Sequence, residues 1–77
     1  MASSRKQFLQ ELIKQHNPAL SNTDVQDVAL AIKISLAQGE SLAKQLEEEG
    51  YLQTVGLSGN IAPTGKGRLA ADDASWD

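Results

Sequence analysis

The side chains that most often carry covalent or metal chemistry are scarce in this sequence of 77 residues. It has no cysteine and a single histidine, His16. The lack of cysteine excludes a disulfide framework, a thiolate metal site and a cysteine nucleophile. One histidine gives no basis for a histidine-rich metal centre or a catalytic triad, and no nucleophile, base and orienting group stand at a recognisable spacing. We therefore expect a protein that is not an enzyme and that uses no cofactor or metal.

Three other groups of residues could bear chemistry, and each also has a simpler structural interpretation. The acidic run Glu47-Glu48-Glu49 fits a solvated helix end better than a metal or acid–base site. Gly65-Lys66-Gly67 invites comparison with a phosphate-binding loop, but it lacks the spacing of that motif and a preceding central strand. Trp76 is an apolar side chain on an acidic tail, where it either stays exposed, folds back or docks on a partner.

The net charge of −3 weighs against a nucleic-acid partner, since such partners are usually bound by a basic surplus. The charge is unevenly distributed along the chain. Residues 1–17 hold three basic residues and one acidic residue, and residues 22–50 hold two basic and six acidic. Residues 51–71 hold two basic residues, and residues 72–77 hold three acidic ones. The middle and the tail are thus acidic, while the remaining segments are mildly basic.

Length and hydropathy indicate one small cytoplasmic domain. No apolar run approaches the ~20 residues needed to span a bilayer. The Met-Ala-Ser-Ser start lacks the apolar stretch of a signal peptide. A chain of this size forms at most one hydrophobic core. We expect a domain over residues 1–71, an acidic flexible tail over residues 72–77, and no membrane partner.

The first half of the chain carries two helical patterns. Residues 5–16 place four apolar side chains on one stripe of a helix, which Asn17-Pro18 ends because a residue before proline is pushed out of the helical region. A second helix, capped by Asn22 or Thr23, is predicted as far as Ile32 from apolar spacings of three and four residues.

A third helix is expected over residues 36–49, with Ser35 as its cap. Gly39 lies in its first turns, where glycine costs about 1 kcal/mol relative to alanine. Gly50 suits the left-handed conformation that ends many helices.

The pattern changes after Gly50. Residues 51–55 are rich in β-branched and aromatic side chains and predict a strand. A turn cluster separates them from a returning strand at Ile61-Ala62, which Pro63 is expected to stop. Thr64 then caps a short helix with residues 68–71 as its body. The order of elements predicts a mainly α fold with a small β-hairpin. Its expected core consists of Phe8, Leu9, Leu12, Ile13, Val25, Val28, Ala29, Ile32, Leu42, Leu46 and Leu52.

Packing residues between Val28 and Leu52 form a pattern that is known from other proteins. Val28-Ala29 pairs on the second helix, two isoleucines flank the turn, and the run Leu46-Glu47-Glu48-Glu49-Gly50-Tyr51-Leu52 leads from the third helix into a strand. This pattern resembles the winged helix-turn-helix family, and Pro63 to Arg68 resembles that family's second wing strand running into a final helix. The resemblance covers roughly residues 5–71 and implies a three-helix core plus a wing.

Two positions depart from the family pattern. The family usually has glycine at the turn, where this chain has Lys33, and an apolar residue where it has Gly39. From Gly39 we expect the start of the third helix to be loosely packed, and both departures bear on the docking geometry more than on the fold.

The resemblance also implies a set of DNA contacts. In the family the third helix enters the major groove and the hairpin wing contacts the backbone. Carried over by position, the implied DNA-binding residues are Lys33, Ser35, Gln38, Ser41, Lys44, Gln45, Ser58, Asn60, Lys66 and Arg68. Gln38 and Gln45 could pair with adenine, while Ser41 and Lys44 could reach phosphates. Glu40 would repel phosphate unless it accepts a hydrogen bond from a cytosine amine.

Two functions stay open on these observations. The first is a transcriptional regulator of bacterial or phage type that binds double-stranded DNA, with a homodimer or a second tethered domain supplying enough contact area. The second is a winged-helix module repurposed for protein–protein interaction, whose acidic surface meets a basic protein partner. The resemblance favours the first and the net charge favours the second. We expect DNA binding.

Overall fold

The computed structural model describes residues 4–16, 23–55 and 60–76 of the chain. Within these ranges it contains four helices and one two-stranded antiparallel sheet, which confirms the expected mainly helical fold with a hairpin. The elements are α1 (Ser4–Gln15), α2 (Val25–Ala31), α3 (Leu36–Glu48), β1 (Leu52–Val55), β2 (Asn60–Pro63) and α4 (Gly65–Asp72).

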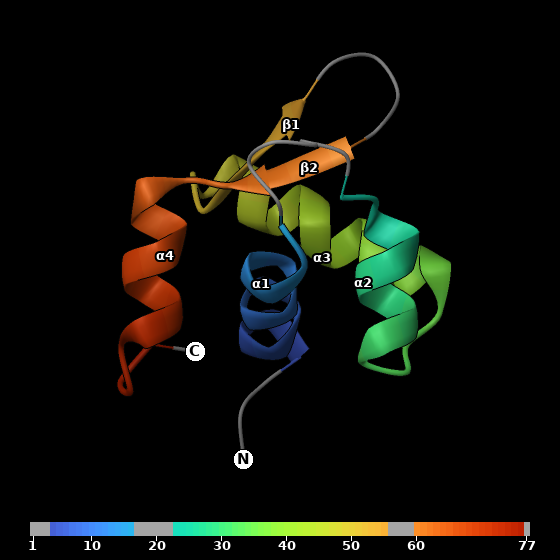
Figure 1. Cartoon of the computed structure of the whole chain (residues 1–77), viewed down its shortest axis with the longest axis horizontal. Helices are drawn as coiled ribbons and strands as arrows, with labels where there is room; N and C mark the ends of the chain where they lie inside the picture. Colours follow the sequence, from blue (N-terminus) through green and yellow to red (C-terminus); the bar gives the residue numbers. More distant parts are fainter. Residues whose placement is uncertain (1–3, 17–22, 56–59, 77) are drawn as a thin grey trace.

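Helix α1 lies at the centre of the domain, between α2 and α4, and the hairpin covers one end of the helices (Figure 1). Helix α1 packs against α2, α3, α4 and β2. Phe8, Leu9 and Leu12 form its buried stripe, as the apolar spacing predicts. The observed helix begins and ends one residue before the predicted one, and Asn17-Pro18 lies outside the described residues.

The start of α2 differs from its prediction. Asp24 is the N-cap, and its carboxylate accepts a hydrogen bond from the Gln26 backbone N–H at 3.1 Å. Thr23, a predicted cap, is instead buried, and its carbonyl accepts from the Ile61 backbone N–H at 2.8 Å. Thr23 and Asp24 continue the hairpin through a bridge to Asn60, so the cap lies one residue after Thr23 and two after Asn22. Asn22, the other predicted cap, lies outside the described residues.

The turn between α2 and α3 follows the predicted capping. Ser35 caps α3, and its hydroxyl accepts from the Gln38 backbone N–H at 3.1 Å. Lys33 takes a left-handed backbone with φ of 62°, which glycine would adopt without steric cost. The chain therefore makes the turn with a residue that is poorly suited to that conformation.

Gly39 corrects the expectation of a loosely packed α3. It is buried, and a Cβ atom at this position would lie 2.8 Å from the Cβ of Ala29 and 3.4 Å from a methyl group of Val25. The absence of a side chain thus lets the backbone of α3 approach α2 closely. The helical cost of glycine is offset by this close packing.

The passage from α3 into the hairpin has the predicted glycine. Gly50 has φ of 86°, and the Tyr51 backbone N–H closes the helix end on the Leu46 carbonyl at 2.9 Å. In the antiparallel ladder, Leu52 is opposite Pro63 and Val55 is opposite Asn60. The second strand is longer than predicted and includes Pro63 as its last residue.

Helix α4 begins as predicted but extends further. The Thr64 hydroxyl accepts from the Gly67 N–H at 3.0 Å and donates to the Gly50 carbonyl at 2.7 Å. The helix ends at Asp72, one residue into the segment expected as a tail.

Residues 73–76, which follow α4, return to the domain. The Trp76 ring packs edge-on against Tyr51, with ring centroids 4.9 Å apart, and the Arg5 guanidinium lies 5.4 Å from the Trp76 ring centroid. Arg5 also forms an ion pair with Glu49. Among the interpretations open for Trp76, the structure shows the one in which it folds back.

All of the residues predicted for the core belong to it, some fully buried and some partly buried. Seven of them are buried: Phe8, Leu9, Leu12, Val28, Ala29, Leu46 and Leu52. Four are partly buried and pack against the core: Ile13, Val25, Ile32 and Leu42. The buried set also includes residues from the second half of the chain that the expected core omitted: Ile61, Ala62, Ala70 and Ala71. In the described ranges no helix has the length and hydropathy needed to cross a membrane.

Candidate functional site

The turn before α3 and the solvent side of α3 bring six of the predicted DNA-binding residues together. Helix α3 buries Gly39, Ala43 and Leu46 against the domain. All six predicted residues of this region are exposed: Lys33, Ser35, Gln38, Ser41, Lys44 and Gln45.

The exposed surface of α3 has two chemically different edges. Residues seven apart lie two turns apart on the same side of a helix. Gln38 and Gln45 are so related and form an amide edge, and Glu40 and Glu47 form a carboxylate edge. Ser41 and Lys44 lie between the two edges. The carboxylate edge faces the hairpin, because Glu47 accepts a hydrogen bond from the hydroxyl of Thr54 on β1.

Of the other four predicted contact residues, the structure describes three, and these come from the hairpin and α4 rather than from α3. Asn60 is half-buried at the start of β2, and Ser58 lies outside the described residues. Lys66 lies at the opposite end of α3, where its ammonium donates to the Glu49 carbonyl at 2.7 Å and lies 4.7 Å from the Tyr51 ring centroid. Arg68 is exposed on α4.

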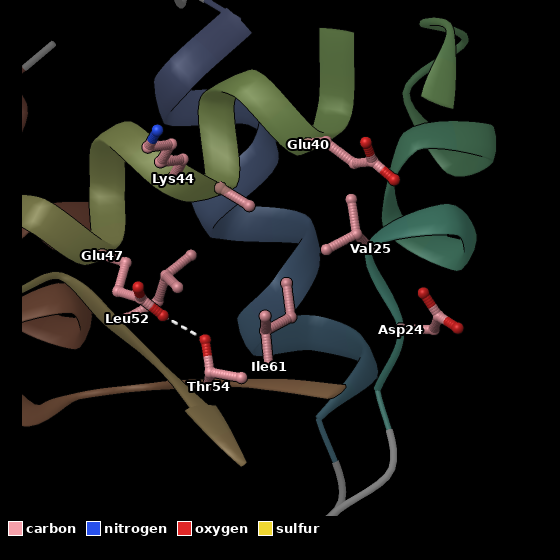
Figure 2. Close-up of a pocket in the computed structure, with 9 residues that line it drawn as sticks. Asp24, Val25, Glu40, Lys44, Glu47, Leu52, Thr54 and Ile61 are labelled. Atoms are coloured by element: carbon pink, nitrogen blue, oxygen red, sulfur yellow. Dashed lines mark hydrogen bonds between the residues drawn. The ribbon is translucent and has the colours of Figure 1, made fainter. Parts of the chain in front are cut away.

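A surface cleft of about 380 Å³ opens between α3, the start of α2 and the hairpin. Figure 2 shows that its lining side chains come from all three elements. Its apolar lining consists of Val25, Ala43, Leu52 and Ile61. Its polar and charged lining consists of Asp24, Glu40, Lys44, Glu47 and Thr54.

The charges around this cleft are unbalanced toward acid. The lining contains three carboxylates and one ammonium. The Lys44 ammonium points away from Glu47 in Figure 2. Glu40 forms no hydrogen bond or ion pair with any other residue that the structure describes. The described residues also contain no group of three or more metal-ligating side chains close enough to hold a metal ion. The cleft therefore has a local negative potential without the geometry of a metal site.

Sequence reasoning singled out Glu40 but missed the cleft as a whole. Asp24 and Glu47 are far apart in sequence, and the bridge between Asp24 and Asn60 is what brings the start of α2 to the hairpin. The only signal in the sequence was the excess of acidic residues between positions 22 and 50. No known protein family, curated protein or solved structure matches this chain.

Proposed function

We propose that this chain is a small winged-helix DNA-binding module that acts as a transcriptional regulator, with α3 in the major groove and the hairpin as its wing. The observation that carries the proposal is the close packing of α2 on α3 through Gly39 and Ala29. This packing leaves the N-terminal half of α3 exposed beside a tight turn. An exposed helix N-terminus held rigidly on a second helix is the element that reads base edges in helix-turn-helix proteins.

The distribution of charge along α3 supports docking by its N-terminal half. Residues 33–45 carry two lysines and one glutamate, whereas residues 46–50 carry three glutamates. The positive end of the helix dipole adds to the attraction for phosphate at the N-terminus. The three glutamates at the C-terminus would lie farthest from the DNA in this orientation.

The proposed contacts are of two kinds: contacts with base edges, which read the sequence, and contacts with phosphates, which position the protein. Gln38 and Gln45 on the amide edge would pair with adenine edges, and Ser41 and Lys44 would bind phosphates. Lys33 at the turn is a further phosphate contact. Asn60 at the start of β2 remains a proposed wing contact, and so does Ser58, which lies outside the described residues. Because Lys66 contacts the C-terminal end of α3 and Arg68 lies on α4, we leave them outside this interface.

Substitutions on α3 test this division. Gln38→Ala should relax the preference for a selected duplex over a random one, because it removes a base contact. Lys44→Ala should weaken binding to both duplexes alike, because it removes a phosphate contact. Arg68→Ala removes the same charge from α4 and should leave both affinities nearly unchanged. Fluorescence anisotropy with the two duplexes measures all three. Equal losses from the three variants on both duplexes would contradict base reading by α3.

A second candidate function is a protein-interaction module, and the acidic cleft is the observation that favours it. A negative potential beside α3 repels phosphate and attracts a basic protein surface. Under this proposal Glu40→Gln slows association with a basic partner, most strongly at low salt, and leaves DNA affinity negligible. Under the first proposal the same variant strengthens DNA binding by removing a repulsion.

A further inference from the structure

We infer that the cleft between α3, the start of α2 and the hairpin binds a basic segment of a partner protein, in which a lysine or arginine lies next to an apolar residue. This inference deepens the second candidate function, on which it rests, by naming the site and the chemistry of the partner. It does not depend on DNA binding.

The floor of the cleft is suited to the apolar part of such a segment. Val25, Ala43, Leu52 and Ile61 line it, one each from α2, α3, β1 and β2. Its volume of about 380 Å³ is within the range of roughly 300–1,000 Å³ typical of ligand pockets. The long aliphatic stem of lysine or arginine can lie on an apolar surface while its charged head stays at the rim.

The rim of the cleft is suited to the charged head. Asp24 stands at the start of α2, and Glu40 and Glu47 stand two turns apart on α3. Two of these carboxylates are held in place, Asp24 by the Gln26 N–H and Glu47 by the Thr54 hydroxyl. Each carboxylate has two oxygens and accepts further hydrogen bonds, so these contacts leave capacity for a cation. Glu40 has no partner among the described residues and is the most available of the three.

Charge and shape together select the occupant. Three carboxylates and one ammonium give the rim a charge of −2, which repels a phosphate backbone and attracts a cation. A small inorganic cation would make no use of the apolar floor, and an uncharged apolar segment would leave the carboxylates without a counter-charge. A protein segment that combines basic and apolar side chains satisfies both surfaces.

Peptide titration of the full chain tests the inference. The probe is a six-residue peptide of alternating lysine and leucine, followed through the backbone amide resonances of the ¹⁵N-labelled protein. Saturable shifts should concentrate on Val25, Ala43, Leu52, Thr54 and Ile61. A peptide with glutamate in place of lysine should not bind. A peptide with serine in place of leucine should bind more weakly.

Two matched variants locate the charge that matters. Glu40→Gln and Glu48→Gln remove the same charge from exposed positions of α3, but only Glu40 lines the cleft. Glu40→Gln should weaken peptide binding about three- to fivefold, as expected for the loss of one exposed ion pair, and Glu48→Gln less than twofold. Unchanged melting temperatures show that both variants remain folded.

Three results would overturn the inference: no saturable binding, shifts centred outside the cleft, or equal weakening by the two variants. The last would indicate general attraction to an acidic helix. Because the titration contains no DNA, it fails or succeeds independently of duplex binding.

Discussion

Leu46 shows at the residue scale how much this small domain depends on single side chains. It has no exposed surface and belongs to the core cluster that joins the helices to the hairpin. Leu46→Ala should lower the free energy of unfolding by about 2–5 kcal/mol, because it removes buried methyl groups and leaves a cavity. A domain of 77 residues has so little stability in reserve that many molecules would unfold.

Thermal unfolding followed by circular dichroism measures this loss. Gln45→Ala, at the adjacent but exposed position, is the control and should change stability by less than about 0.5 kcal/mol. A melting temperature unaffected by Leu46→Ala would contradict the core described above.

The turn after α4 perturbs the ionisation of Asp73. Hydrogen bonds from the Ser75 hydroxyl, at 2.7 Å, and from the Ser75 backbone N–H, at 2.9 Å, hold the pKa of the Asp73 carboxyl below its ordinary value. Desolvation of the carboxyl opposes this effect, and the positive charge of Lys6, the smallest of the four contributions, also lowers the pKa. These bonds favour the ionised form and organise the turn that follows α4.

The pH dependence of this turn follows from the lowered pKa. A group whose pKa is lower in the folded state stabilises the fold above its ordinary pKa, about 4, and loses that contribution as pH falls through the lowered value. Ser75→Ala removes the hydroxyl donor, so the pKa of Asp73 should rise toward the ordinary value. Titration of the side-chain carboxyl by NMR measures the change. Identical titration curves for the variant and the parent would contradict the assigned cause.

At the scale of elements, local chemistry predicts most boundaries. The apolar stripe of residues 8–12, the Ser35 and Thr64 caps and the Gly50 helix end all occur where the sequence places them. These features depend on neighbours within one or two turns, which a sequence pattern contains. The Asp24 cap is different, because pairing of Thr23 with Ile61 across the fold sets where α2 begins.

The role of Gly39 depends on a contact with another helix, which a local sequence pattern does not contain. A glycine within a helix normally costs stability, and alanine there would normally restore it. Gly39→Ala should instead destabilise the domain by about 1–3 kcal/mol, because the added Cβ would lie 2.8 Å from the Ala29 Cβ and would force α2 and α3 apart.

A double-mutant cycle isolates this contact. Adding Ala29→Gly to Gly39→Ala restores the space between the helices. Ala29→Gly should therefore lower the free energy of unfolding less in the Gly39→Ala protein than in the parent. Chemical denaturation of the four proteins measures the coupling. A more stable Gly39→Ala variant would show that the helices do not need this close approach.

At the scale of the whole molecule, the candidate site has two parts, the exposed side of α3 and the cleft beside it. The sequence predicts the first part but not the second. The exposed residues of α3 follow from helical periodicity, because the buried positions define the solvent side. The cleft does not, since it requires α2, α3 and the hairpin to be placed relative to one another. The contact between Trp76 and Tyr51 likewise joins the C-terminal segment to the residue before β1, which no local pattern indicates.

The central claim is that α3 docks this domain on duplex DNA, and a salt-dependent titration tests it most directly. The parent chain and Lys44→Ala are titrated with a random duplex by anisotropy at several salt concentrations from about 50 to 200 mM. Neutralised phosphates release counterions, so the parent should bind at low salt and lose affinity steeply as salt increases, by roughly one power of the salt concentration for each phosphate contact. Lys44→Ala should bind with a salt slope smaller by about one such contact. Absence of binding by the parent even at the lowest salt would contradict the DNA proposal.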